Sequence, residues 1–278
     1  MKEWCIVSES EPVASVVFAA GKGSRMVGFD GNKTLLPLIP GASSLYQGDR
    51  PMLMEVLGNL TPGPRGVVVN HRAEDVRRIV GEENAVFLHQ PVTNGTGGAL
   101  LAAKPFLESA STEMVVITMG DVPLIRPESY MRLIESLNAA TLALLAFEPA
   151  DKAQYGLLEL NGERRVRRIV EWKYWKDYAA ERQAGLRYCN AGVYAARRLP
   201  LLHYMNVLAG MPHHVEKRRG DRLVTIEEFF ITDLVELMSG DGLSVAFTCV
   251  PEEEVAGVDA PESLRRAQER YALRKAGR

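Results

Sequence analysis

A glycine-rich loop beside two basic residues is the part of this sequence best suited to chemistry. The loop lies in the segment Ala19-Ala20-Gly21-Lys22-Gly23-Ser24-Arg25-Met26. Gly21 and Gly23 permit backbone conformations that bring main-chain N–H groups close to phosphate oxygens. Arg25 and, a few residues later, Lys33 add two positive charges. The combination predicts a binding site for a polyphosphate.

The loop matches neither of the two common phosphate-binding fingerprints. A Rossmann fingerprint has a third glycine where Met26 stands, and a Walker A loop has Gly-Lys-Ser/Thr where Gly28-Phe29-Asp30 follow. Two glycines alone are also compatible with an ordinary strand-to-helix turn. The nearby Arg25 and Lys33 favour the phosphate site over that alternative.

Composition bounds the class of protein. The chain has 278 residues, of which 46% are hydrophobic, enough for a large core, and its formal net charge of −2 argues against a dedicated nucleic-acid binder. Cys5, Cys189 and Cys249 are few and widely spaced, as expected of reduced thiols in the cytoplasm. We find neither a secretory h-region nor an apolar run of bilayer-spanning length. We therefore predict a cytoplasmic protein with no nucleic-acid or membrane partner.

Strand-like and helix-like patterns alternate through the first half of the chain. The predicted strands are 13–19, 66–69, 86–89, 114–119 and 142–147, and the predicted helices are 74–80, 99–107 and 128–137. Such alternation indicates an α/β fold with a Rossmann-like, mostly parallel sheet and helices on both faces. Ligands in such folds bind at the carboxyl ends of the strands.

The second half has a different pattern that predicts a smaller, β-rich region. We expect a hairpin of strands 155–160 and 166–170 around Asn161-Gly162, and a strand at 188–194. Thr225 and Glu228 form a capping-box pattern that predicts a helix over 225–238. A strand at 243–250 and a final helix from Pro261 follow, and the polar segment 211–222 is expected to be a mobile loop.

Polar residues follow two of the predicted strands. Gln90 begins the segment Gln90-Pro91-Val92-Thr93-Asn94-Gly95-Thr96-Gly97, where its amide can bind a nucleobase edge, although Thr96 can equally be a helix N-cap. Asp121 follows the strand 114–119 and is suited to Mg²⁺, which prefers one or two carboxylates together with phosphate oxygens. The alternative for Asp121 is a turn aspartate, a common residue before proline.

Three further charged segments have simpler explanations. Asp259 precedes Ala260-Pro261-Glu262, and spacing alone favours Asp259 as a helix N-cap. The run 164–168 is typical of a solvated hairpin edge. His213-His214 has no third metal ligand nearby in sequence, so we do not expect a metal site there.

Taken together, these segments resemble the sugar-phosphate nucleotidylyltransferase superfamily, most closely the pyrophosphorylase domain of bacterial N-acetylglucosamine-1-phosphate uridylyltransferases. In order, the matching pieces are the loop 19–26, Lys33, Gln90, Gly95-Thr96-Gly97, Gly120-Asp121-Val122-Pro123-Leu124, Tyr155-Gly156, Arg168-Ile169-Val170-Glu171, Asn190-x-Gly192, Ile231-Thr232-Asp233 and Glu254-Val255-x-Gly257-Val258. The resemblance implies the nucleotide-diphospho-sugar transferase fold in one domain over 1–278. It divides the domain into a nucleotide-binding half (about 1–150), a sugar-binding half (151–260) and a C-terminal helix (261–278), and no hexapeptide acetyltransferase pattern accompanies them.

The resemblance also implies roles for individual residues. The implied nucleotide-binding residues are Ala20, Gly21, Gly23, Gln90, Gly95 and Thr96, and the implied sugar-binding residues are Gly156, Glu171 and Asn190. Arg25, Lys33 and Asp121 are implied to be catalytic. Asp121 and Asp259 are implied Mg²⁺ ligands. At the position of Asp259 the uridylyltransferase has an asparagine, whereas deoxythymidylyl relatives have an aspartate in the comparable role. This reverses the preference for Asp259 as a helix cap.

The implied reaction joins a nucleoside triphosphate, UTP rather than dTTP, to a sugar 1-phosphate and releases pyrophosphate. N-acetylglucosamine 1-phosphate or a related hexose 1-phosphate is the expected acceptor, but three departures lie in the sugar-binding half: the aromatic segment 172–175, Ala191 and the segment 211–222. The aromatic residues either wall the sugar pocket or pack in the core. The alternatives are a cytidylyltransferase acting on a small alcohol phosphate or a molybdopterin, and a non-catalytic regulatory protein that binds a sugar nucleotide. The sequence predicts no oligomeric state.

Overall fold

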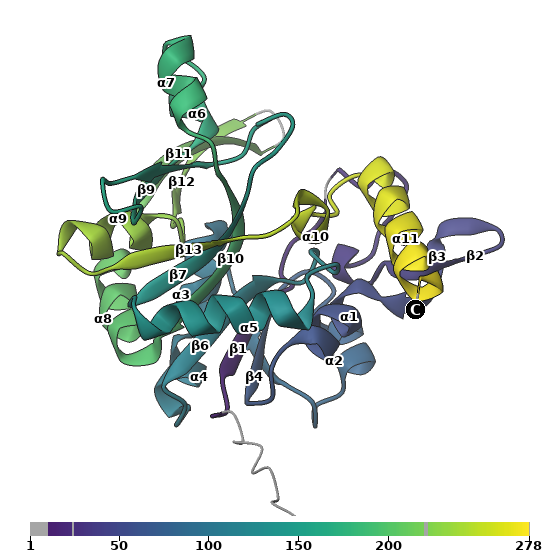
Figure 1. The fold of residues 1–278 in the computed structure, drawn as a ribbon. Coiled ribbons are helices and arrows are strands. Elements are labelled where there is room, and N and C mark those ends of the chain that lie inside the picture. The colour runs from purple at the N-terminus through teal and green to yellow at the C-terminus, as the bar shows by residue number, and fades with distance from the viewer. Residues whose placement is uncertain (1–10, 24, 220–221, 278) are drawn as a thin grey trace, which may run out of the picture.

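A mostly parallel sheet forms the centre of the molecule (Figure 1). The computed structural model describes residues 11–23, 25–219 and 222–277. In spatial order the main strands are β13 (Val245–Cys249), β7 (Leu142–Phe147), β10 (Cys189–Arg197), β6 (Met114–Met119), β1 (Ala14–Phe18), β4 (Arg65–Val69) and β5 (Val86–His89). Neighbours in this order are parallel, except that β10 runs antiparallel to β6 and β7. The predicted α/β class with a mostly parallel sheet is confirmed.

Helices cover both faces of the sheet, and each face has its own hydrophobic core. One face packs against α1 (Met52–Asn59), α2 (Ala73–Val80) and α5 (Pro127–Glu135); the other packs against α3 (Gly95–Ala102), α4 (Lys104–Ser109), α8 (Arg198–Ala209) and α9 (Asp233–Gly240). Strands β1 and β7 are buried along their whole length, as expected from the unbroken apolar sequence of β7 and from that of β1, in which Ser15 is the one polar residue. None of the helices in the described ranges is sufficiently long and apolar to cross a lipid bilayer.

The β-rich region extends the sheet beyond β10. The hairpin of β8 (Leu157–Leu160) and β9 (Val166–Val170) pairs with β10 through Leu157 and Cys189. The short helices α6 (Trp172–Trp175) and α7 (Ala180–Gly185) follow it. A separate ribbon of β11 (His213–Arg219) and β12 (Arg222–Glu228) lies close to β9 and α6 in Figure 1. The predicted hairpin around Asn161-Gly162 is confirmed.

Two predictions for the second half of the chain are wrong. The segment 211–222 is not an irregular loop, because most of it belongs to the β11–β12 ribbon. The predicted helix over 225–238 is a strand as far as Glu228, and its helical part, α9, begins only at Asp233. The backbone of Phe229 accepts a hydrogen bond from Gly97 N–H (2.8 Å) and donates one to Asn94 O (2.9 Å). These bonds to Phe229, together with the pairing of β12 with β11, hold the chain out of the helix that the local capping pattern favours.

A smaller correction concerns the helix predicted over 99–107. It consists of two helices, α3 and α4, separated at Ala103. Pro105 lies in the first turn of α4, where the missing proline N–H removes no helical hydrogen bond. Inside one continuous helix, Pro105 would leave the carbonyl group four residues earlier without its N–H donor.

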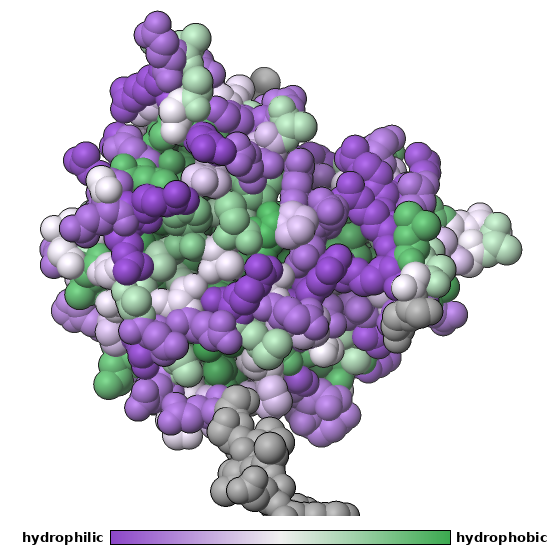
Figure 2. All heavy atoms as spheres, in the orientation of Figure 1, coloured by the Kyte–Doolittle hydropathy of each residue, from purple (hydrophilic) through white to green (hydrophobic). Residues whose placement is uncertain are grey.

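The C-terminal helix predicted from Pro261 is α11 (Pro261–Ala276), and it packs against a hairpin that we did not predict. This hairpin consists of β2 (Pro37–Gly41) and β3 (Ser44–Pro51), and Figure 1 shows α11 beside it. Gln268 is buried on α11 and donates hydrogen bonds to Pro37 O (2.8 Å) and Leu45 O (3.0 Å). Hydrophilic side chains cover much of the face on which α5 and α11 lie (Figure 2).

The Gln268 amide therefore anchors α11, and we expect Gln268→Leu to destabilise the protein. The substitution leaves two carbonyls without their donor, which should lower the free energy of unfolding by about 1–3 kcal/mol. Urea denaturation measures this change. The exposed neighbour Glu269 supplies the control, since Glu269→Ala should stay within about 0.5 kcal/mol of the original protein. Equal effects of the two substitutions would contradict the anchoring role.

Candidate functional site

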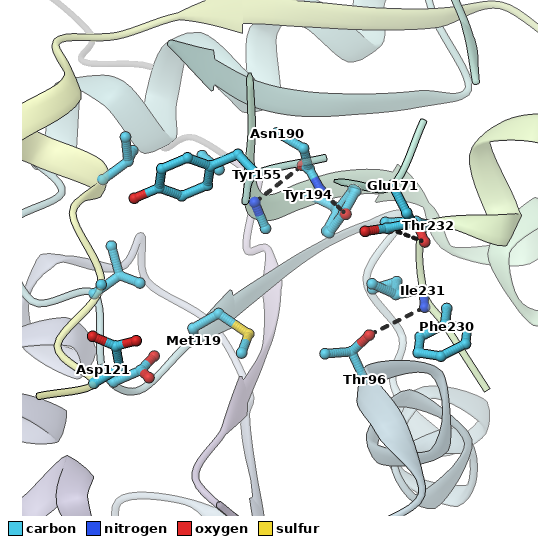
Figure 3. A pocket seen from close by; sticks show the side chains of 16 residues that line it. Thr96, Met119, Asp121, Tyr155, Glu171, Asn190, Tyr194, Phe230, Ile231 and Thr232 are labelled. Atoms are coloured by element: carbon cyan, nitrogen blue, oxygen red, sulfur yellow. Dashed lines mark hydrogen bonds between the residues drawn. The ribbon is translucent and has the colours of Figure 1, made fainter. Parts of the chain in front are cut away.

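Two adjoining cavities lie where β1 and β6 end. The loop cavity, of about 300 Å³, is lined by Ala20, Gly21, Lys33, Gln90, Gly95 and Glu228, among others. The Glu171 cavity, of about 440 Å³, is lined by Tyr155, Glu171, Asn190, Thr232 and Asp259, among others. Thr96, Met119 and Asp121 line both. Figure 3 shows Asp121 on one side of the Glu171 cavity, Glu171 with Thr232 on the other, and Met119 between them.

A buried asparagine positions Lys33. Asn32 donates from Nδ2 to Ala19 O (2.7 Å) and His71 O (2.9 Å), and its Oδ1 accepts from the N–H (3.0 Å) and hydroxyl (2.8 Å) of Thr34. Lys33 therefore begins its short 3₁₀ helix, Lys33–Leu35, at a fixed point beside the end of β1. Its ammonium group forms a largely buried ion pair with Asp121.

Gly23 explains why the loop before Lys33 needs a glycine. Its φ is +62°, and a Cβ there would lie 2.9 Å from Cβ of Lys33. A larger residue would have to adopt an unfavourable backbone conformation and push against Lys33 at the same time. The glycine loop therefore packs directly on the lysine that the sequence assigns to the same site.

A second ion pair lies at the mouth of the site. Arg25 Nη1 is 2.6 Å from Asp259 Oδ2, and the Arg25 side chain is otherwise mostly exposed. Asp259 is held near Asp121 because Val258 N–H donates to Asp121 O (2.9 Å). Two cations and two carboxylates thus meet at the ends of the predicted glycine loop, strand β6 and the segment before α11.

Asp259 is not the N-cap of α11, so the expectation from spacing alone is wrong. The helix begins at Pro261, and Ala260 occupies the N-cap position. Ser263 Oγ accepts hydrogen bonds from the N–H groups of Asp259 (2.9 Å) and Ala260 (3.0 Å) instead. A side chain from within the helix thus caps it, and the Asp259 carboxylate faces Arg25 and the cavity.

The segment 94–97 is held by the chain that follows β12. A Cβ on Gly95, whose φ is +93°, would lie 2.3 Å from Phe229 O, so only glycine fits this close approach. Thr96 Oγ1 accepts a hydrogen bond from Ile231 N–H (3.2 Å), and the N-cap position of α3 belongs to Asn94 rather than Thr96. Gln90 is buried beside them and donates to Asn94 Oδ1 (3.2 Å).

The three predicted sugar-binding residues lie together. Asn190 N–H donates to Gly156 O (2.8 Å), and the Asn190 amide is oriented by hydrogen bonds with Gly192 N–H (3.0 Å) and the Tyr194 hydroxyl (2.9 Å). The Glu171 carboxylate accepts a hydrogen bond from the Thr232 hydroxyl (3.2 Å). Glu171 and Asn190 line the cavity, as Figure 3 shows, and a Cβ on Gly156 would lie 3.6 Å from Glu171 Oε2.

Burial changes the acid–base properties of this cavity. Removal from solvent raises the pKa of Glu171, an effect that the Thr232 hydrogen bond and the charge of Lys173 oppose. Burial also raises the pKa of Tyr155, with further contributions from the negative charges of Glu252 and Asp259. Tyr155 is therefore a neutral hydroxyl group at physiological pH.

Most of the predicted site residues line one of the two cavities, but Gly23, Arg25 and Gly156 lie just outside the linings. Tyr155 and Thr232 line the Glu171 cavity and were assigned no role from the sequence. Both belong to segments, Tyr155-Gly156 and Ile231-Thr232-Asp233, that carried the family resemblance, so a signal for them existed. The roles themselves remain predictions.

The predicted metal ligands, Asp121 and Asp259, are both oxygen donors. Asp121 and Asp259 both line the Glu171 cavity. Within the described residues, no group of three or more His, Cys, Asp or Glu side chains could hold a metal ion. His213 Nε2 lies 2.8 Å from Asp233 Oδ2, so this ring nitrogen is hydrogen-bonded to a carboxylate.

Comparison with known proteins identifies the family. The model of the MobA-like NTP transferase domain matches residues 15–182, which is more than half of the chain. The chain belongs to this family. The matched region contains the glycine loop, Lys33, Gln90 and Asp121, together with Glu171 of the second cavity.

Similarity to curated proteins extends over nearly the whole chain. It is 35% identical to the bifunctional protein GlmU of Ruegeria sp. (strain TM1040), over 92% of this chain and 52% of that protein. It is 31% identical to the bifunctional protein GlmU of Alcanivorax borkumensis, over 93% of this chain and 52% of that protein. The chain thus spans about half the length of these curated relatives.

Solved structures show the same fold at lower identity. A candidate UDP-N-acetylglucosamine pyrophosphorylase from Entamoeba histolytica superposes with a TM-score of 0.70 at 16% identity, covering 96% of this chain and 83% of that one. A CMP:2-keto-3-deoxy-manno-octonic acid synthetase in complex with CTP gives a TM-score of 0.63 at 16% identity, covering 95% and 100%. The nucleotide-diphospho-sugar transferase fold implied by the sequence is confirmed.

The raised pKa of Glu171 predicts a pH-dependent effect of Glu171→Gln. The pKa of Glu171 is higher in the folded protein than in the unfolded chain, so ionisation of Glu171 destabilises the folded state. This destabilisation grows as the pH rises from the unfolded pKa through the folded pKa. The glutamine variant should therefore gain stability relative to the original protein between pH 4 and pH 7. Urea denaturation at both pH values measures the difference, with the exposed Glu253→Gln as control. A difference that is the same at both pH values would refute the prediction.

Proposed function

We propose that this chain transfers a nucleotidyl group from a nucleoside triphosphate to a sugar 1-phosphate and releases pyrophosphate. The observation that carries the proposal is the junction of two cavities at Asp121. One cavity has the features of a triphosphate and base site, and the other those of a sugar site. A phosphate bound beside Asp121 would lie between the two substrates.

The loop cavity suits a nucleoside triphosphate. Gly21 and Gly23 leave the main chain accessible, and Lys33 supplies a largely buried positive charge. The Gln90 Nε2 group donates to Asn94 Oδ1 (3.2 Å) and Gly95 O (3.4 Å), and its Oε1 can accept a hydrogen bond from the ring N–H of uracil. We therefore propose UTP as the preferred nucleotide, with Arg25 contacting the departing pyrophosphate.

The Glu171 cavity suits a hexose. A carboxylate and an amide, those of Glu171 and Asn190, face a space that contains a small number of further polar groups. The oxygens of this carboxylate and this amide can accept hydrogen bonds from sugar hydroxyls. This pair favours a sugar 1-phosphate over a small alcohol phosphate or a molybdopterin. N-acetylglucosamine 1-phosphate is the first acceptor to test, because the sequence resembles enzymes that use it.

The chemistry requires charge compensation rather than a general base. The sugar phosphate oxygen that attacks the α-phosphorus is already anionic at neutral pH, and pyrophosphate leaves on the opposite side. The difficulty is to bring several negative charges together, which oriented cations ease. Lys33 and Arg25 are held in position by Asp121 and Asp259, and each cation can turn from its carboxylate to a phosphate oxygen.

Mg²⁺ is the cofactor that these carboxylates fit. Asp121 and Asp259 supply oxygen ligands at the same cavity, and Mg²⁺ is commonly bound by one or two carboxylates plus substrate phosphates. When bound, the ion would neutralise phosphate charge. Coordination of the ion by Asp121 would break the Lys33–Asp121 ion pair. Lys33 could then contact the phosphate groups of the two substrates.

The reaction is tested by pyrophosphate release with Mg²⁺ across a grid of nucleoside triphosphates and sugar 1-phosphates. We expect release with UTP and a hexose 1-phosphate. Lys33→Ala and Asp121→Asn should each lower kcat at least 100-fold, because the first removes a positive charge beside the transferring phosphate and the second removes a proposed Mg²⁺ ligand. Asp177→Asn changes an exposed carboxylate and should leave kcat unaltered. A folded protein that binds nucleotide but releases no pyrophosphate with any pair would favour the regulatory alternative.

The metal assignment predicts a separate result. Chelation by EDTA should abolish pyrophosphate release, and added Mg²⁺ should restore it. Asp259→Ala should raise the Mg²⁺ concentration needed for half-maximal activity several-fold, because one of the two carboxylates is lost. Activity that persists in EDTA, or an unchanged Mg²⁺ requirement in the variant, would argue against Asp259 as a ligand.

A further inference from the structure

A third cavity adjoins the proposed sugar site and is not used by the proposed reaction. It has a volume of about 390 Å³ and shares Glu171, Phe230 and Thr232 with the Glu171 cavity. Its other walls include Trp172, Tyr174 and His213. We name this space the aromatic annex. The hydrogen-bonded pair of Glu171 and Thr232 lines both cavities.

The short helix α6 builds the annex from consecutive residues. Trp175 is buried and its indole N–H donates to Tyr155 O (2.8 Å), so this tryptophan is part of the core. That bond anchors α6 beside Glu171, from which the helix starts. Trp172 and Tyr174 line the annex, and 54% of Tyr174 is exposed. The aromatic segment is thus divided between core packing and a cavity wall.

Polar groups lie among the aromatic rings of the annex. Lys173 Nζ is 4.7 Å from the ring centroid of Tyr174 and 6.0 Å from that of Phe230. The His213 ring packs against Phe230, with centroids 5.0 Å apart, and its Nε2 lies 2.8 Å from Asp233 Oδ2. Aromatic faces are thus interleaved with hydrogen-bonding groups of both charges.

Building on the proposed function, we propose that the annex binds a second hydroxylated ring carried by the sugar 1-phosphate, so that the acceptor is a disaccharide 1-phosphate or a similarly ring-extended hexose. The C–H face of such a ring packs on aromatic side chains, and its hydroxyls satisfy the polar groups between them. The first ring would occupy the Glu171 cavity and the second would cross beside Phe230 and Thr232.

Other occupants fit these walls less well. A purely apolar chain would cover Lys173 and the His213–Asp233 pair without offering them hydrogen bonds. An anionic group would face three carboxylates in the annex lining against one lysine, Lys173; the carboxylates are those of Glu171, Asp233 and Glu236. A neutral, hydroxylated ring avoids both costs.

The first experiment compares kcat/KM for a hexose 1-phosphate with that for disaccharide 1-phosphates linked through C2, C3, C4 or C6 of the first ring. At least one disaccharide 1-phosphate should react with a kcat/KM no lower than that of the hexose 1-phosphate. Tyr174→Ala should then lower kcat/KM roughly tenfold for that acceptor, as expected for one aromatic contact, and leave the hexose 1-phosphate unchanged. A hexose 1-phosphate carrying a linear alkyl acyl group of similar size tests the apolar alternative.

Tyr178→Ala is the matched control. Tyr178 follows Tyr174 by four residues, packs under Arg182, and lies outside the annex lining. The control should leave both acceptors unaffected. Rejection of every disaccharide 1-phosphate, better use of the alkyl acyl compound, or an equal loss on both acceptors in Tyr174→Ala would each overturn the proposal.

A binding measurement separates this proposal from the proposed reaction. Trp172 lines the annex, so a phosphate-free disaccharide should change the tryptophan fluorescence of the full chain, and Trp172→Phe should remove most of that change. If no pyrophosphate is released with any pair but this fluorescence change occurs, the proposed reaction fails and the saccharide site stands. If hexose 1-phosphates react but no disaccharide changes the fluorescence, the annex proposal fails and the reaction stands.

Discussion

The site depends on one buried amide side chain, that of Asn32. An asparagine side chain has two N–H donors and an oxygen with two acceptor positions, and Asn32 uses all four. Its partners come from the end of β1, from the chain after β4 and from the residue following Lys33. A buried polar group left without partners costs about 1–3 kcal/mol, so these segments are held in one arrangement. Lys33 is positioned by this arrangement before any ligand binds.

Charge pairing is the second constraint on the site. Lys33 and Asp121 are both largely buried, and removing either alone would leave an uncompensated charge. Arg25 and Asp259 form the same kind of pair at a more exposed position. A site that must accept several phosphate charges needs its cations in place beforehand, and carboxylates that can exchange partners keep them there. The pairing therefore serves both the stability of the protein alone and the chemistry proposed for it.

The sequence predicted the parts of the molecule that depend on local patterns. The buried strands that precede Gly21 and Asp121 were recognisable, because each is an apolar run followed by a turn that contains glycine or aspartate. The Arg25–Asp259 pair was not recognisable as a pair, since it joins distant parts of the chain and α11 had to be placed against β2 first. The strand β12 was mistaken for helix because Thr225 and Glu228 imitate a capping box, while the competing partners are the strand β11 and, for Phe229, the backbone of Asn94 and Gly97.

The chain that follows β12 joins the two cavities physically. Phe229 exchanges backbone hydrogen bonds with Asn94 and Gly97, Ile231 N–H donates to Thr96, and the Thr232 hydroxyl donates to Glu171. Three residues of the segment 229–232 thus contact either the start of α3 beside the loop cavity or the carboxylate of the Glu171 cavity. A shift of the start of α3 toward a bound nucleotide would move the group that orients Glu171. The glycines at 95 and 97 serve this close packing, and their substitution would disturb both cavities even though only Gly95 lines one of them.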